Sequence, residues 1–108
     1  MIGETVYRFD RNRRVYLPGD AGPSYEGHFE PLKIWGETPA FWLCGFEFNP
    51  WKVNKRQILT GVAGAFYTAS AMEDKIWLND HAWKIADAVK HADANQLKKI
   101  AAIIGYPT

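Results

Sequence analysis

Cysteine is nearly absent from this chain, because Cys44 is the only one in 108 residues. One cysteine excludes an internal disulfide and any metal site built from several thiolates. Long apolar runs are missing too, since Gly, Thr or a charged residue interrupts each before the ~20 residues that a membrane span needs. The first residues lack a basic segment followed by an apolar one, so we expect no secretory signal. These absences favour a cytoplasmic protein without a membrane partner.

An excess of one charge is missing as well. The 13 Lys and Arg residues stand against 12 Asp and Glu residues, which leaves a net charge of +1. Whole-molecule electrostatics therefore gives little attraction to nucleic acid or to a membrane surface. The basic residues nevertheless gather in two local groups, which are Arg8, Arg11, Arg13 and Arg14, and then Lys52, Lys55 and Arg56.

Catalytic and metal-binding motifs are also absent. The sequence contains no GxSxG elbow, no GxxxxGK[ST] phosphate loop and no HExxH arrangement. His28, His81 and His91 do not have the spacing of a metal-ligand set. Cys44 lies in a strand-like apolar stretch, where a buried and unreactive thiol is more common than a nucleophile. We therefore expect no catalytic residue, no metal and no cofactor, and we predict that the protein is not an enzyme.

Aromatic residues are abundant in the first half of the chain. Eleven of the 16 Phe, Trp and Tyr residues lie in the first 51 positions, at near strand-like spacing, and such side chains suit a pleated surface. Turn signals at 10–13, 36–39 and 49–50 separate the segments. Pro31 should confine its strand to an edge or a break, and Gly45 should bend the next one. The expected strands are residues 4–9, a return strand from 15–16, part of 25–34, 40–48, 51–55 and, within the least legible stretch 57–69, residues 65–68.

The C-terminal third has helical periodicity. Ser70 and Glu73 fit a capping box at the start of one helix, and Asp93 with Gln96 fits a second one. Gly105 is the type of residue that commonly ends a helix. The short break at 91–93 predicts a helical hairpin. Its apolar stripes need cover, so we expect the hairpin to pack on the sheet and to bury Leu78, Ile85, Val89, Leu97, Ile100 and Ile104.

These patterns predict an α+β fold in a single domain of residues 1–108. Residues 1–69 should be mainly β, as a small curved antiparallel sheet or SH3-like barrel of about five strands, of the Tudor or KOW type. Residues 70–106 should form the helical hairpin that packs on it.

One resemblance can be drawn from several short segments. Ile34, the triplet at 36–38, Trp42, the segment 52–55 and the terminal segment 99–106 together resemble small uncharacterised proteins encoded by bacteriophages and prophages. The resemblance spans most of the chain. It implies a phage or prophage origin, with the host cytoplasm as the location, and it carries over no catalytic residue.

The missing catalytic motifs, the balanced charge and the surplus of aromatics favour a non-enzymatic protein-interaction module. The resemblance implies a phage accessory protein acting on a host factor, such as a defence or transcription component, or on another phage protein. Trp35, Trp51 and Arg13 are the first candidates for the contact, because aromatics and Arg commonly anchor interfaces. Exposure of Trp77 and Trp83 would indicate an interface on the helices. The oligomeric state is left open.

A nucleic-acid-binding barrel is the alternative. Aromatic rings can stack on bases while neighbouring cations contact phosphates. Charges that only keep hairpin edges soluble would explain the same pattern, and the balanced net charge favours that explanation. The residues that would bind nucleic acid are Arg8, Arg11, Arg13, Arg14, Lys52, Lys55 and Arg56.

Overall fold

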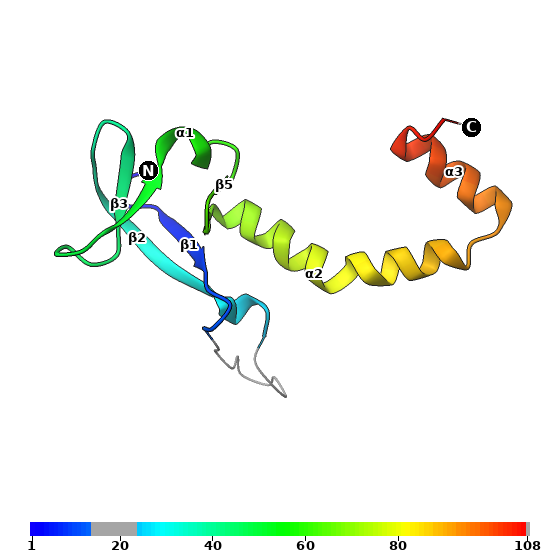
Figure 1. The fold of residues 1–108 in the computed structure, drawn as a ribbon, viewed down its shortest axis with the longest axis horizontal. Helices are drawn as coiled ribbons and strands as arrows, with labels where there is room; N and C mark the ends of the chain where they lie inside the picture. The colour runs from blue at the N-terminus through cyan, green and yellow to red at the C-terminus, as the bar shows by residue number, and fades with distance from the viewer. Residues whose placement is uncertain (14–23, 108) are drawn as a thin grey trace. The chain divides into compact units, whose positions relative to one another are not determined.

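The structure is a computed structural model that describes residues 1–13 and 24–107. The chain forms two compact units, residues 1–76 and 77–108, and each is described by itself. Arg14 and the return strand expected from 15–16 lie outside the described residues. The elements (Figure 1) are β1 (Thr5–Phe9), η1 (Glu26–His28), β2 (Phe29–Glu37), β3 (Phe41–Cys44), β4 (Trp51–Asn54), α1 (Lys55–Ile58), β5 (Val62–Ala63), β6 (Phe66–Tyr67), α2 (Ala69–Lys90) and α3 (Ala94–Ile104).

The first unit is a six-stranded antiparallel sheet in the order β4-β3-β2-β1-β6-β5, curled into a nearly closed small barrel. The predicted α+β class, with a small barrel followed by a helical hairpin, is confirmed. Residues 65–68 contain β6, as expected. The sequence predicted about five strands and missed β5 and the short helix α1, both of which lie in or next to the stretch that was hardest to interpret.

The core lies on the inner face of the sheet and follows the alternation of the strands. Val6, Ile34, Cys44 and Val53 are fully buried, and each comes from a different strand. Side chains at alternate positions of a strand point to the same face, so one residue in two from each strand meets the others inside. The remaining buried members of this cluster are Leu32, Ile58, Ala63 and Phe66.

An aromatic cluster covers the other face of β1 and β2. The rings of Phe9, Phe29, Tyr25 and His28 lie 5.2–5.9 Å apart between neighbouring centres, in tilted or edge-on arrangements. Edge-on contacts are favourable because the positive edge of one ring meets the negative face of another. Met72, from the first turn of α2, is buried and lines a small hollow on this face with Phe29. The start of α2 is therefore anchored on the sheet.

The turn and the proline of the first half behave largely as expected. The carbonyl of Asp10 accepts from the Arg13 amide and its carboxylate accepts from the Asn12 amide, which confirms the turn at 10–13. Pro31 lies in β2, which has β1 on one side and β3 on the other. Because β3 pairs with β2 only from Ile34 onward, β1 is the only described strand that pairs with β2 at Pro31.

Helix boundaries differ from the expected ones at two starts. Asn54 caps α1 by accepting from the Arg56 and Gln57 amides, so Lys55 begins a helix where the sequence predicted the end of a strand. Likewise α2 begins at Ala69, and its cap is the Thr68 hydroxyl, which accepts from the amide of Ala71. The Ser70–Glu73 capping box was therefore a wrong prediction.

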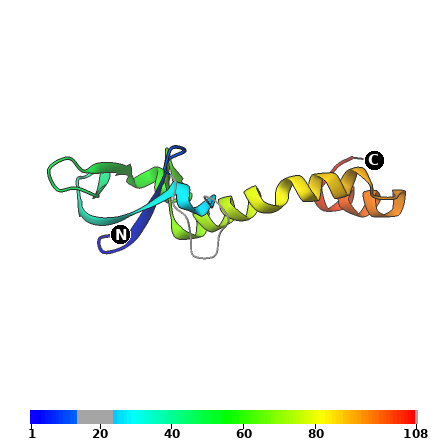
Figure 2. The ribbon, with the colours of Figure 1, turned by 90° about the horizontal axis from the view of Figure 1, so that it is seen from below.

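The end of the chain matches the prediction closely. Asp93 and Gln96 form the reciprocal capping box of α3, and Gly105 ends that helix in the left-handed conformation. After the end of α2 the chain turns, and α3 leads back at an angle to the last turns of α2 (Figures 1 and 2). No helix among the described residues combines the length and the apolar character that crossing a membrane requires.

The apolar stripe of the hairpin is open within residues 77–108. Leu78, Ile85, Leu97 and Ile104 are exposed, so contacts within this unit do not bury them. Val89 and Ile100 are half-buried. The packing of the hairpin on the sheet stays a prediction.

Candidate functional site

Trp51 connects strands that lie apart in the sheet order. It lies directly opposite Cys44 in the β3–β4 pairing, and paired residues share a face of the sheet, so its indole lies on the inner side. The guanidinium carbon of Arg8 lies 4.5 Å from the centre of the indole, and the Phe66 ring lies 6.2 Å away, edge-on. Trp51 therefore joins β4 to β1 and β6, which are not its neighbours in the sheet order.

The loop between β3 and β4 is fixed at its base by Gly45. This glycine has a φ of +78°, and a Cβ there would lie 3.1 Å from Cδ1 of Trp51. A larger residue would meet both backbone strain and the indole. The Gly45 carbonyl also accepts a hydrogen bond of 3.0 Å from Nε1 of Trp35. The loop thus leaves the sheet from a defined position.

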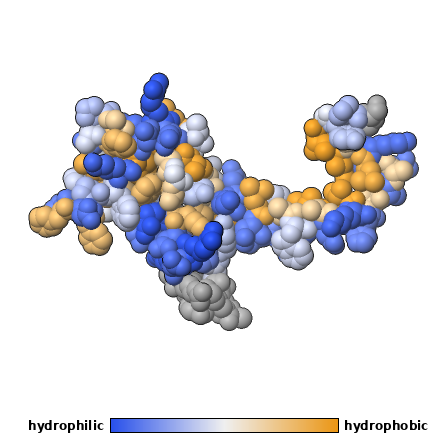
Figure 3. All heavy atoms as spheres, viewed as in Figure 1, coloured by the Kyte–Doolittle hydropathy of each residue, from blue (hydrophilic) through white to orange (hydrophobic). Residues whose placement is uncertain are grey.

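Two phenylalanines at this loop are left in water. Phe46 is 77% exposed and Phe48 is 101% exposed, which is as open as a side chain in an extended peptide. Apolar side chains gather at the tip of the loop, at the far left of the view in Figure 3. Packing in the barrel does not require these rings, and exposed aromatics on a scaffolded loop are typical of binding sites.

A hollow of about 470 Å³ lies beside the loop. Binding pockets commonly have volumes of this order. The cation of Lys52 lies 6.0 Å from the centre of the Phe41 ring and makes no ion pair with any described residue. We call Phe46, Phe48, Trp51 and Lys52 the aromatic loop surface. The hollow is lined by Phe46, Asn49, Pro50, Trp51 and Lys52.

The structure brings together only part of the predicted contact set. Trp35, Trp51 and Lys52 all lie at the base or side of this loop. Lys55 follows the opposite end of β4, where its Nζ lies 2.6 Å from a Glu37 carboxylate oxygen and 4.4 Å from the centre of the Trp42 ring. Lys55 is therefore engaged within the fold.

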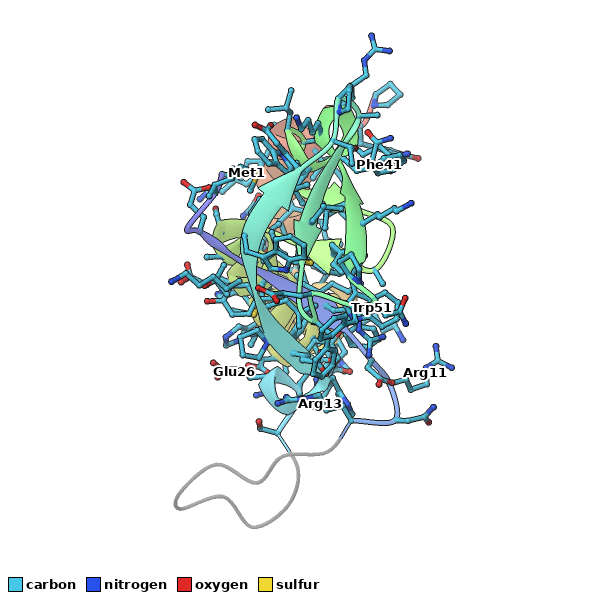
Figure 4. The ribbon with its side chains drawn as sticks, turned by 90° about the vertical axis from the view of Figure 1, so that its left-hand side faces the viewer. Met1, Arg11, Arg13, Glu26, Phe41 and Trp51 are labelled. Atoms are coloured by element: carbon cyan, nitrogen blue, oxygen red, sulfur yellow. The ribbon has the colours of Figure 1, made fainter. Side chains whose placement is uncertain are left out.

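Arg13, from the basic group at 8–14, makes hydrogen bonds within the fold. Nη1 of Arg13 donates to the carbonyls of Gly27 (2.7 Å) and Phe29 (3.1 Å), and so ties the turn to η1 and β2. Arg13 is thus a structural residue, although it was a first candidate for the contact. Arg11 is exposed, and its side chain extends away from the barrel in Figure 4.

Of the remaining basic residues in the described part of the chain, some contact other residues of the fold and some are exposed. Arg8 pairs with Asp10 at 3.4 Å while it stacks on Trp51. Arg56 is exposed on α1. Within the described part of the chain the predicted cations therefore do not form one continuous basic surface.

Phe46 and Phe48 are the residues that the sequence interpretation missed. They were assigned to the expected strand 40–48, and strand alternation would have put them on a face of the sheet. The signal was present, because Gly45 before them and the Asn-Pro pair after them both interrupt strands. A segment between two such breaks forms a loop, and its apolar residues are then left without a core.

Metal-binding groups and the one thiol can be assessed among the described residues. They hold no group of three or more His, Cys, Asp or Glu side chains that could bind a metal. Burial, with a smaller contribution from the negative charge of Glu30, raises the pKa of the Cys44 thiol to about 11. A thiol with such a pKa is almost entirely protonated at neutral pH and is a poor nucleophile.

Comparison with protein-family models, with curated proteins and with solved structures gave no match.

Proposed function

We propose that residues 1–76 form a non-enzymatic protein-binding module and that the aromatic loop surface is its contact site. The observation that carries the proposal is the exposure of Phe46 and Phe48 on a loop that Gly45 and Trp35 hold at its base. A loop that is already ordered loses less conformational entropy on binding than a floppy one. The two rings are therefore suited to act as anchors.

The magnitude of the hydrophobic effect supports this role. Burying a phenylalanine that water surrounds contributes roughly 1.5–3 kcal/mol. Two rings together contribute roughly 3–6 kcal/mol, which corresponds to a factor of about 10² to 10⁴ in the dissociation constant. Most of the binding energy of an interface commonly comes from a few such side chains.

The chemistry of the surface indicates what the partner presents. Its apolar part should be a groove or patch that receives the two rings, and an acidic side chain should lie near Lys52. The resemblance to phage and prophage proteins makes a host factor, such as a defence component, the partner class that we propose first. Another phage protein is the second.

Replacing both phenylalanines by alanine (F46A/F48A) should weaken partner binding by about 100-fold or more, because both anchors are lost. The thermal midpoint should change little, since these exposed rings are not part of the core. Proteins captured from a lysate of the source cell by the tagged full chain are identified by mass spectrometry. The dissociation constant of a captured protein is then measured by calorimetry.

The matched control is L59A, which also truncates a highly exposed apolar side chain (86%) but lies beyond the far end of β4. It should retain the captured proteins and their affinity. If the wild type, L59A and F46A/F48A capture the same set with equal affinity, the loop is not the contact site.

Nucleic acid is the second candidate, because Lys52 lies beside aromatic rings that could stack on bases. This hypothesis ranks below protein binding, because ion pairs or hydrogen bonds within the fold already occupy Arg8, Arg13 and Lys55. Three predicted cations in the described chain remain exposed, namely Lys52, Arg11 and Arg56. They could neutralise few phosphates.

We therefore expect weak binding to single- and double-stranded DNA and RNA. Fluorescence anisotropy with labelled nucleic acids measures this affinity. Each neutralised phosphate adds about −0.7 to −0.9 to the slope of log affinity against log salt, so the three exposed cations of the described residues contribute no more than about −3 to this slope. Under the nucleic-acid hypothesis K52A reduces the steepness by about 1. Absence of binding at low salt, where electrostatic attraction is strongest, removes this candidate.

A further inference from the structure

The second unit carries an apolar stripe with the spacing of a helix bundle. On α2 the stripe consists of Leu78, Ala82, Ile85 and Val89, which follow one another in steps of four, three and four residues. On α3 the apolar residues Leu97, Ile100 and Ile104 continue the same kind of spacing, with steps of three and four. Alternating steps of three and four are typical of helices that pack along one another in bundles.

The residues of the stripe are apolar and mostly exposed, and the lining of the groove beside them includes Lys99 of α3. Leu78 is 51% and Ile85 is 49% exposed, and a groove of about 410 Å³ lies between α2 and α3 next to Ile85 and Ile100. At helical spacing, the charged residues of α2 after Leu78 fall on other sides of the helix. These residues are Asp80, Lys84, Asp87 and Lys90. Like charges therefore do not oppose contact between two identical stripes.

The stripe of α2 is complementary to itself when two copies run antiparallel. In that alignment Leu78 faces Val89 of the second copy, and Ala82 faces Ile85. Each layer then pairs a larger with a smaller side chain, which is how facing helices fill a core without voids or clashes. A parallel alignment would instead set Ile85 against Ile85 and Ala82 against Ala82. The order of large and small side chains along the stripe thus favours a second copy that runs antiparallel to the first.

We propose that this face binds the same face of a second copy of the chain, so that two hairpins form an antiparallel four-helix bundle. A two-fold axis makes such an interface self-complementary. The stripe from Leu78 to Val89 is about 16 Å long at 1.5 Å per residue. An interface of this length is at the small end of the range, so we expect a dissociation constant in the micromolar range.

Sedimentation velocity of the full chain at about 5–500 µM tests the proposal. The wild type should pass from monomer to dimer in this range. A82I should weaken the dimer about tenfold or more by overfilling a layer, and I85A should do the same by emptying it. The double variant A82I/I85A exchanges the two sizes across the layer. It should therefore restore the dissociation constant to within about threefold of the wild type.

The control is K84A, which removes a long exposed side chain from another side of α2 and should leave the dimer unchanged. Circular dichroism verifies that each variant keeps its helices. Concentration-dependent amide shifts in NMR spectra should map to residues 78–104. A wild type that stays monomeric, as it would if the hairpin packed on its own sheet, overturns the proposal. A double variant no better than the single ones, or shifts confined to the β3–β4 loop, also overturns it.

Discussion

Replacing Ile34 by alanine should lower the free energy of unfolding of the barrel unit by about 2–5 kcal/mol. The Ile34 side chain has no exposed surface, and it lies among fully buried residues that include Val6, Cys44 and Val53. Truncation removes apolar contacts and leaves a cavity in a small core that has few other side chains to fill it. For a unit of this size the thermal midpoint should fall by roughly 10 °C or more. Thermal and urea unfolding, followed by near-ultraviolet circular dichroism, measure the change.

The comparison with I2A separates this effect from the chemical change itself. Ile2 undergoes the same truncation, but its side chain is 57% exposed. We expect I2A to stay within about 0.5 kcal/mol of the wild type. Equal losses in the two variants, or a negligible loss in I34A, would contradict the core described above.

The sequence predicted the class of the fold because the relevant signals are local and repeated. The longer strands can be recognised from the alternation of apolar and polar residues and from the turn residues between them. The barrel could therefore be predicted without knowing which strands pair. β5 and β6 have two residues each, which is too short to show a period of two. β6 was found from its aromatic residues, whereas β5 was missed. Pairing rather than local preference defines such elements, because β6 pairs with the distant β1 and β5 pairs with β6 at the edge of the sheet.

Helix ends show the same division between local and distant causes. Asp93, Gln96 and Gly105 act on amides and carbonyls within a few residues, so their roles could be predicted. Thr68 and Ser70 are two hydroxyl residues near the same helix start, and sequence alone does not decide between them. Thr68 belongs to the end of the β5–β6 hairpin, where its amide donates to the Gly61 carbonyl. The hairpin sets the start of α2, and the choice of cap follows from it.

The candidate site was predicted in part for a similar reason. The tryptophans were chosen as anchor types, and Trp35 and Trp51 each lie next to Gly45 at the base of one loop. The basic residues were chosen as neighbours in sequence, but their partners lie elsewhere in the chain. Arg13 bonds to carbonyls 14 and 16 residues away, and Lys55 pairs with a carboxylate 18 residues away. Charge clusters in a sequence therefore overestimate the charge available on the surface.

The thiol of Cys44 should react with a thiol reagent at pH 8 at least about 100-fold more slowly in the native chain than in the unfolded chain. Burial raises its pKa from 9.0 to about 11, with a smaller contribution from Glu30. Each pKa unit lowers the thiolate fraction about tenfold well below the pKa, so the shift alone gives roughly 100-fold. The side chain has no exposed surface, which slows access further. Rates of reaction with iodoacetamide, with and without guanidinium chloride, measure the difference.

The same shift makes a prediction about stability at high pH. The fold favours the protonated thiol, because its pKa is higher in the folded chain than in the unfolded one. The stabilisation from Cys44 is therefore fully present below about pH 9 and is lost as the pH rises toward about 11. Other groups titrate in this window, so the informative quantity is the difference between the wild type and C44A. The free energy of unfolding of the wild type should decline more steeply from pH 9 to 11. Parallel curves, or rapid labelling of the native thiol, would show that Cys44 is not held as a buried, protonated thiol.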